Sequence, residues 1–121
     1  MEKIVQMFKA LGDETRLKIL IILSRSSICA KGIAKHLDIS EAAVSQHIRV
    51  LKEAGIVVGE KVGYYVHYDL QESKLLEIIE FIEQMNKDHM MNSFELDMHI
   101  PNKCKASCKS SKNKCCQKGD K

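Results

Sequence analysis

The chain has 121 residues, of which 45% are hydrophobic and 29% are charged. This length predicts one domain with a tail, and this composition excludes a disordered chain and a fibrous repeat. The longest uninterrupted apolar run, 19–23, is far shorter than the roughly 18 residues of a membrane-spanning helix, so we expect no membrane segment. The first residues lack the apolar core of a secretory signal, which predicts a cytoplasmic protein whose five cysteines serve metal or redox chemistry rather than disulfides.

The net charge of +3 is distributed unevenly along the chain. The segment 101–121 carries seven lysines and one aspartate and sums to +6, so the preceding hundred residues sum to −3. Within that body, 31–61 sums to +1 and 70–100 sums to −5. A polyanionic partner is therefore expected to contact the middle of the chain and to avoid the region after residue 70.

The apolar pattern of the first residues predicts two short helices. Ile4, Phe8 and Leu11 are spaced for one helix face, and Gly12 ends this first helix. Asp13 can cap a second helix. We expect this second helix to be buried on most sides, because its apolar residues surround it: Leu17, Leu20, Ile21 and Leu23.

Two further helices and a tight turn are predicted before the midpoint of the chain. The third helix covers about 29–37, and Ser40 can cap a fourth helix after a turn at 38–40. Ala54-Gly55 ends this fourth helix. Its narrow apolar stripe consists of Val44, Ile48 and Leu51.

After Gly55 the apolar period changes from 3.6 to 2, which is typical of strands. The segments 56–58 and 64–68 are β-branched and aromatic, and we expect them to pair as a hairpin across a loop at 59–63. A last helix from about Glu72 carries a broader apolar face than a domain of this size can cover alone. That face and the first helix are expected to form a dimer interface through Ile4, Phe8, Leu75, Ile79, Ile82 and Met85.

The single proline, Pro101, precedes a stretch rich in lysine, serine and cysteine without apolar periodicity, for which we expect a flexible tail. We therefore divide the chain into a folded unit at 1–92 and a tail at 93–121. Four helices, a hairpin and a last helix describe a winged helix-turn-helix, so the predicted fold class is mainly α with a small β-hairpin.

The face of the fourth helix opposite its stripe carries short or planar polar groups. At 100° per residue this face consists of Ala42, Ser45, Gln46, Arg49 and Glu53. Glutamine can bond adenine and arginine can bond guanine in the major groove, while small side chains permit close approach to the bases. The alternative is a solvated helix face, but the hairpin and the local charge favour double-stranded DNA as the partner.

Three segments resemble the ArsR/SmtB family of small winged-helix repressors, namely FKALGDETRLKILIIL, SEAAVSQHIRVLKEAGIV and GYYVHYDL. The resemblance covers roughly residues 4–85. It implies a homodimer joined through its first and last helices, and an operator duplex with dyad symmetry. It also implies that the DNA is released when a metal or metalloid binds.

In this family, the segment that matches 45–49 enters the major groove, and the wing tip approaches the flanking minor groove. Tyr64 stands at the tip where a basic residue is common in the family. His47 lies about 60° from the apolar stripe, which favours a phosphate contact or an intramolecular hydrogen bond over base reading. The predicted DNA-contacting residues are therefore Ala42, Ser45, Gln46, His47, Arg49, Lys52, Lys61 and Tyr64.

The family's usual sensing sites are incomplete in this sequence. Arsenic and cadmium sensors often carry Cys-Val-Cys at the start of the third helix, where this chain has Cys29 but Lys31 in place of the second cysteine. Zinc sensors carry two histidines on the last helix, where the matching positions are Lys74 and Met85. The sequence therefore argues against the zinc site on the last helix.

Four cysteines instead fall within the last eighteen residues, and together with Cys29 they form the predicted metal site: Cys104, Cys108, Cys115 and Cys116. Three thiolates can surround As(III), and four can surround Zn(II) or Cd(II). We expect one of these thiophilic ions to be the inducer that releases the operator. The alternative is a solubilising tail with incidental cysteines.

Three other functions are alternatives to an ion-sensing repressor. The thiols can act as a redox or persulfide switch in a DNA-binding repressor, or the chain can buffer metal without binding DNA. An enzyme is the least favoured of the three, because Cys29 and His36 lack a third group that would orient them for nucleophilic catalysis.

Overall fold

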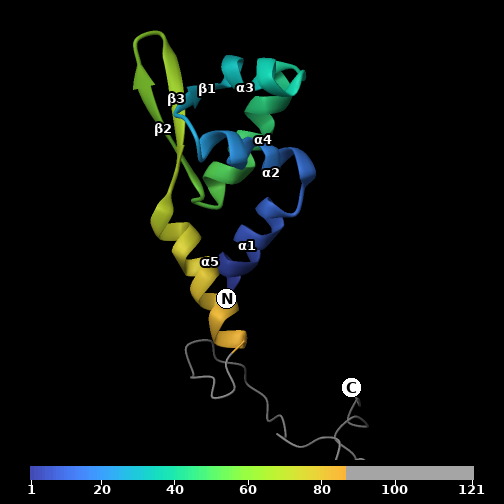
Figure 1. Ribbon diagram of the computed structural model, residues 1–121, viewed down its shortest axis with the longest axis vertical. Helices are drawn as coiled ribbons and strands as arrows, with labels where there is room; N and C mark the ends of the chain where they lie inside the picture. The colour runs from blue at the N-terminus through green and yellow to red at the C-terminus, as the bar shows by residue number, and fades with distance from the viewer. Residues whose placement is uncertain (87–121) are drawn as a thin grey trace, which may run out of the picture. The chain divides into compact units, whose positions relative to one another are not determined.

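The computed structural model describes residues 1–86, which form five helices and three strands (Figure 1). In chain order they are α1 (Glu2–Leu11), α2 (Glu14–Leu23), β1 (Ile28–Cys29), α3 (Ala30–Leu37), α4 (Glu41–Glu53), β2 (Val57–Val62), β3 (Tyr65–Leu70) and α5 (Glu72–Met85). Among these helices, none is both long and apolar enough to cross a membrane. The tail predicted at 93–121 lies outside the described residues.

Helix α4 lies at the centre of the apolar core, where it packs against α1, α2, α3 and β2. Its predicted stripe is confirmed, because Val44, Ile48 and Leu51 are at most 2% exposed. The most completely buried side chains come from five of the elements and the turn before β2: Met7, Ile19, Ile33, Val44, Leu51, Ile56 and Val57. Each such side chain stabilises the fold by about 1.5–3 kcal/mol. The stripe therefore fixes which side of α4 faces outward.

Two helix caps predicted from the sequence are confirmed. Oδ2 of Asp13 accepts a hydrogen bond from the backbone N–H of Arg16 at 3.0 Å, at the start of α2. Oγ of Ser40 accepts one from the backbone N–H of Ala43 at 3.0 Å, at the start of α4. Asp38 ends α3 in the left-handed conformation, with φ 57° and ψ 47°. The tight turn between α3 and α4 thus forms as predicted.

The prediction that α2 is buried on most sides is wrong. Ile19 is fully buried, whereas Leu17 is 46% exposed and Ile21 is 53% exposed. Helix α2 packs against α1, α3, α4 and β3, and these contacts leave Leu17 and Ile21 exposed. An almost uninterrupted apolar run has no periodicity to reveal its outer side, which is why the sequence did not show this exposure.

The hairpin forms, but the prediction of a loop at 59–63 is wrong. Strand β2 continues to Val62, which pairs with Tyr65, so the turn consists of Gly63 and Tyr64. Gly63 has a φ of +66°. Two-residue hairpin turns require a positive φ at this first central position, and glycine adopts it without steric cost.

Gly59 does not interrupt strand β2, because the absence of its side chain makes room for residues of β3. A Cβ atom at Gly59 would lie 2.9 Å from Cγ1 of Val66 and 3.0 Å from Cε1 of Tyr68. The aromatic ring of Tyr68 therefore packs over the glycine. Gly59 suggested a loop in the sequence, but in the structure it allows close packing between two strands of the sheet.

Strand β1 was not predicted. It pairs antiparallel with β3, with Ile28 opposite Tyr68 and Cys29 opposite His67, so the strand order is β1-β3-β2. Two residues are too few to show an alternating pattern. The third helix begins at Ala30, one residue after its predicted start, because Cys29 occupies the N-cap position.

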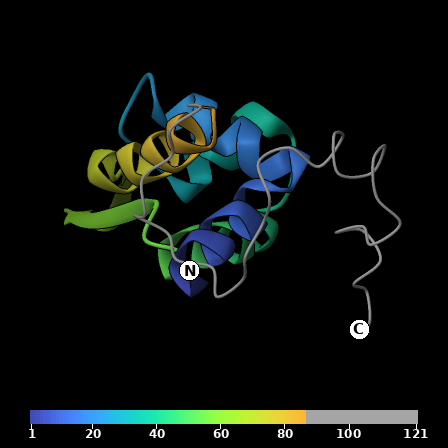
Figure 2. The same cartoon turned by 90° about the horizontal axis from the view of Figure 1, so that it is seen from below.

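Helices α3 and α4 and the hairpin behind them form a winged helix-turn-helix, as predicted (Figure 1). The wing tip and the C-terminal end of α5 lie at opposite ends of the described residues (Figure 1). Helices α1 and α5 lie beside each other in both views (Figure 2). They meet through Phe8 and Phe81, whose rings pack edge to face with centres 5.8 Å apart.

Candidate nucleic-acid interface

The outer face of α4 consists of exposed residues, opposite the buried stripe. The residues that the sequence placed on this face are all exposed: Ala42, Ser45, Gln46, Arg49 and Glu53. The N-terminal part of the face carries hydroxyl and amide groups, and Arg49 follows one turn later. This arrangement can enter a major groove with its first turns nearest the base edges.

A groove of about 300 Å³ separates the outer face of α4 from strand β3. Its lining residues are Ser45, Ile48, Arg49, Lys52, Glu53 and Tyr68. Nζ of Lys52 lies 6.0 Å from the centre of the Tyr68 ring. This distance is at the limit of a cation–π contact, so the ammonium group is held beside the groove while remaining exposed to solvent. Two cations, Arg49 and Lys52, therefore border one groove.

The wing tip carries one cation and two tyrosines. Lys61 is exposed near the end of β2. Tyr64 is 98% exposed in the turn, and Tyr65 is 51% exposed at the start of β3. The tip therefore offers a phenol ring and hydroxyl groups, together with a single ammonium group, to any surface that it contacts.

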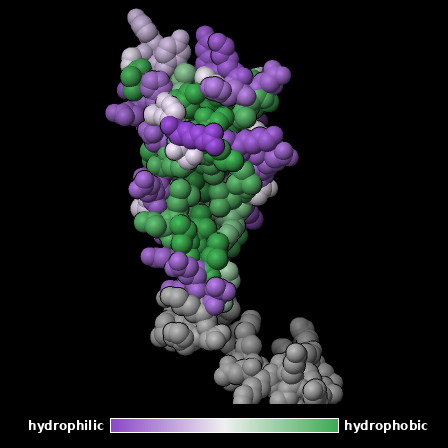
Figure 3. Space-filling model, viewed as in Figure 1, coloured by the Kyte–Doolittle hydropathy of each residue, from purple (hydrophilic) through white to green (hydrophobic). Residues whose placement is uncertain are grey.

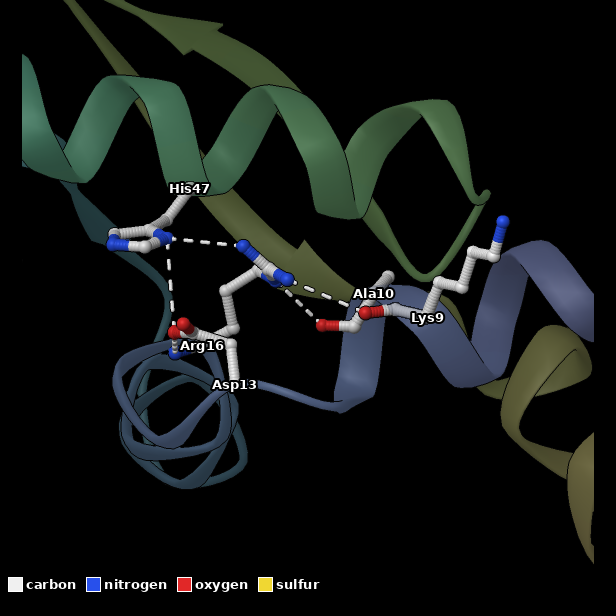
Figure 4. Close-up of polar contacts among 5 residues, drawn as sticks. All are labelled: Lys9, Ala10, Asp13, Arg16 and His47. Carbon is white, nitrogen blue, oxygen red and sulfur yellow. Dashed lines mark hydrogen bonds and ion pairs between the residues drawn. The ribbon is translucent and has the colours of Figure 1, made fainter.

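His47 does not belong to the outer face of α4. Its side chain is 25% exposed and points toward α2, where Nη1 of Arg16 lies 3.3 Å from its Nδ1 atom (Figure 4). Oδ2 of Asp13 lies 3.9 Å from the same nitrogen. Of the roles the sequence left open for His47, an intramolecular hydrogen bond is therefore the one the structure forms.

Sequence reasoning missed Arg16, which joins three helices. Nε of Arg16 donates to the carbonyl oxygen of Ala10 at 2.6 Å, and Nη2 donates to that of Lys9 at 3.3 Å (Figure 4). These carbonyls belong to the last turn of α1, and the carbonyl oxygen of Lys9 also accepts from the backbone N–H of Gly12 at 3.2 Å. The residue type of Asp13 predicts the cap of α2, but the contact of Arg16 with α4 spans 31 residues and leaves no local signal.

The pKa of Asp13 is lowered from its usual value of 3.8, mainly by the backbone N–H of Arg16 that donates to the carboxylate. The guanidinium of Arg16 lowers this pKa further by its positive charge. A carboxylate whose pKa is lower in the folded state stabilises the protein above its unfolded pKa and loses that contribution as the pH falls. The cap of α2 is therefore sensitive to acid.

Asp13→Asn is expected to make the free energy of unfolding less dependent on pH below 3.8, because asparagine can cap α2 without a titrating group. Urea unfolding at a series of acidic pH values measures this difference. Glu60→Gln removes an exposed carboxylate on β2 and serves as the control, which should keep the pH dependence of the wild type. Parallel pH curves for Asp13→Asn and wild type would contradict the role given to Asp13.

The residues predicted for a dimer interface differ in their exposed fraction in the single chain. Ile4 is 8% exposed and lies in the chain's own core, and Leu75 is half-buried. The remaining four have exposed fractions of 37% to 57%: Phe8, Ile79, Ile82 and Met85. Val5 and Leu76 add exposed apolar surface to the same two helices. Figure 3 shows apolar side chains gathered over the region of α1 and α5.

Of the five cysteines in the predicted metal site, Cys29 is the one that lies within residues 1–86. Cys29 is half-buried and free, at the junction of β1 and α3. Across residues 1–86, no three histidine, cysteine or acidic side chains come together as a metal site. The other four predicted ligands lie outside the described residues: Cys104, Cys108, Cys115 and Cys116.

Comparison with known proteins gives consistent matches. Residues 13–58 match the family described as bacterial regulatory protein, arsR family. The chain is 36% identical over 85 residues to an uncharacterized HTH-type transcriptional regulator of Methanocaldococcus jannaschii, covering 69% of this chain and 96% of that protein. It is 40% identical over 67 residues to the arsenical resistance operon repressor of Escherichia coli, covering 54% of this chain and 57% of that protein.

A solved structure agrees with these sequence matches. An ArsR-like transcriptional regulator from Rhodococcus sp. RHA1 superposes with a TM-score of 0.66 at 30% identity, covering 70% of this chain and 80% of that one. The match in sequence spans the helix-turn-helix, and the match in structure spans most of the described residues. The chain therefore belongs to the arsR family of bacterial transcriptional regulators.

Proposed function

We propose that this protein is a homodimeric transcriptional repressor that binds a dyad-symmetric DNA operator and releases it when a thiophilic metal or metalloid ion binds cysteine thiolates. The observation that carries the DNA-binding part is the exposed polar face of α4, held outward by a stripe that is at most 2% exposed. Membership of the arsR family supports the same function.

The outer face of α4 supplies the contacts to bases. Gln46 can bond N6 and N7 of adenine, and Arg49 can bond O6 and N7 of guanine. Ala42 and Ser45 are small enough to let the helix approach the base edges. Lys52 and Lys61 neutralise phosphates on either side of the base contacts.

The charges elsewhere in the chain favour this orientation of the DNA. Helix α5 carries four glutamates and one lysine. Its C-terminal end lies at the opposite end of the described residues from the wing tip (Figure 1). A duplex that contacts α4 and the wing therefore stays away from the negative charges of α5.

Arg49→Ala and Lys52→Ala are expected to weaken DNA binding in different ways. Arg49→Ala should cost about 1–3 kcal/mol on the operator and flatten the preference at one base pair. Lys52→Ala should weaken binding to all duplexes alike and reduce the salt slope by about one. Fluorescence anisotropy with operator and random duplex over a salt series measures both effects. An equal loss on both duplexes for Arg49→Ala would make Arg49 a phosphate contact.

A homodimer through α1 and α5 is supported by the exposed apolar side chains of these helices. A contiguous apolar surface on a small domain is typical of a protein interface. Two copies of α4 related by a twofold axis would contact two half-sites of one operator, which is why a dimer implies dyad symmetry in the DNA.

The proposal that a thiophilic ion is the inducer is supported by the chemistry of cysteine thiolates as ligands. Thiolates prefer soft ions, so As(III) and Cd(II) fit a cysteine site better than a hard cation does, and Zn(II) is the remaining candidate. The described residues supply one thiol, Cys29, so the other sulfurs come from the cysteines after Pro101. The E. coli relative is, by its name, a repressor of an arsenical resistance operon.

The test is a titration of labelled duplex from the protein's own promoter, with As(III), Cd(II), Zn(II) or an oxidant added in turn. Under reducing conditions, one of the ions should weaken binding by about 5–150-fold, the range of a coupling free energy of 1–3 kcal/mol. Release by the oxidant alone would favour a redox switch. Failure to bind any promoter duplex would favour a metal-buffering protein.

A further inference from the structure

The side chain of Arg16 lies between the helix proposed to contact DNA and a helix proposed to contact the second subunit (Figure 4). It donates to the carbonyls of Lys9 and Ala10 at the end of α1, and it contacts His47 on α4. We propose that Arg16 is a positioning residue that sets the placement of α4 relative to α1, with His47 as its contact point. This inference rests on the proposed function and concerns the spacing between the two recognition helices of the dimer.

The apolar contacts of α4 determine which side of the helix is buried. They come from Val44, Ile48 and Leu51, and apolar burial is non-directional, so it allows small shifts of a helix along its partners. A hydrogen bond has a preferred distance and angle, so it opposes such shifts. The contact between Arg16 and His47 supplies this directional restraint on the side of α4 that faces α2.

Arginine suits this role because of its geometry. Its planar guanidinium has five N–H donors in a fixed arrangement, and three of its nitrogens lie within 3.3 Å of acceptors on α1 and α4. Lysine carries a single nitrogen and cannot reach the same three acceptors at once. The backbone N–H of Arg16 also donates to Asp13, which anchors the residue at the start of α2.

The contact also involves a single nitrogen of the His47 ring. A guanidinium donates but does not accept, so Nδ1 of His47 is the acceptor in this contact, and the same nitrogen lies 3.9 Å from Oδ2 of Asp13. The ring is partly buried, at 25% exposed, and it is removed from the outer face of α4. His47 therefore influences DNA through the placement of α4 rather than through a contact with the bases.

In a dimer, the placement of α4 relative to α1 becomes the distance between the two recognition helices. Helix α1 lies beside α5 and shares with it the proposed dimer surface, so it moves with the interface. A shift of α4 against α1 is doubled by the twofold axis. The quantity that Arg16 controls is therefore the half-site spacing that the dimer accepts, whereas the half-site sequence is read by the outer face of α4.

The experiment selects duplexes from a random-sequence pool with the wild-type protein and with His47→Leu. Leucine fills a similar volume but accepts no hydrogen bond, and it leaves the bonds of Arg16 to α1 in place. His47→Asn keeps an acceptor near the position of Nδ1, and Arg16→Lys removes the fixed geometry of the donors. Arg25→Lys, at an exposed position just after α2, is the matched control.

The wild type is expected to select two half-sites at one spacing, and to bind that duplex about tenfold or more tightly than one with a base pair inserted between the half-sites. His47→Leu and Arg16→Lys should select the same half-site sequence with several spacings and bind the two duplexes about equally. His47→Asn and Arg25→Lys should retain the wild-type preference. Thermal unfolding confirms that each variant is folded.

Two outcomes separate the inference from the proposed function. If the wild type selects no dyad-symmetric duplex, the proposed function fails, and this inference fails with it. If the wild type selects one spacing and His47→Leu keeps it, or loses the half-site sequence while folded, the positioning role alone is overturned and DNA binding stands.

Discussion

Ile82→Glu is expected to convert the protein into folded monomers that no longer hold a dyad-symmetric operator. Ile82 is 46% exposed on α5 and contributes little to the chain's own core. In the proposed dimer, its substitution places a carboxylate from each subunit in an apolar contact. An unpaired charge buried in this way costs about 3–5 kcal/mol, which is several orders of magnitude in the dimer dissociation constant because both subunits carry it.

Sedimentation velocity measures the mass of this variant, and anisotropy with the operator measures its binding. Val58→Glu is the matched control, because Val58 is an apolar residue that is similarly exposed, at 40%, but lies in the wing. This control should sediment as the wild type does. A dimer mass for Ile82→Glu would show that the apolar surface of α5 is not the interface.

The double variant Cys115→Ser, Cys116→Ser is expected to bind the operator normally and to remain bound when As(III) or Cd(II) is added. We propose that these two thiols hold the inducer, with a third sulfur from Cys104, Cys108 or Cys29. Ordering a chain segment costs about 1–2 kcal/mol per residue, and bonds between thiolates and a soft ion are strong enough to offset that. The charge of +6 on 101–121 is opposite in sign to that of the four glutamates of α5, and this attraction is the basis on which we propose that the ion acts on the dimer interface.

The comparison for this variant is Ser110→Ala, Ser111→Ala, which changes a neighbouring pair without removing a thiol. That control should release the operator at the same ion concentration as the wild type. Release by the cysteine double variant at an unchanged ion concentration would contradict the role of the C-terminal thiols. Cys29→Ser would then be the next variant to measure.

The features predicted correctly from the sequence are those with a short-range cause. The stripe of α4 follows from residues at helical spacing, and the caps at Asp13 and Ser40 follow from side chains three residues before the N–H groups they accept. The outer face of α4 then follows by geometry, because the buried stripe fixes the rotation of the helix. Local sequence is therefore sufficient to predict the candidate DNA-contacting face.

The features missed from the sequence depend on distant partners. Gly59 reads as a loop residue, but its place in β2 is set by Tyr68 across the sheet. The two residues of β1 become a strand because β3 pairs with them. Arg16 meets His47 across 31 residues, and the exposed side of α2 depends on which helices pack against it. The metal site remains a prediction, because four of its five cysteines lie outside residues 1–86.

The separation of the two faces of α4 means that recognition and stability can change independently. Gln46 and Arg49 are exposed, so exchanging them alters what the helix reads at a cost to folding of about 0.5 kcal/mol or less. Tyr68 has no such freedom, because its ring packs over Gly59 on one side and lines the groove beside α4. Substitution of a few exposed side chains on α4 could thus give the protein a new operator sequence, while the residues of the sheet behind α4 stay unchanged.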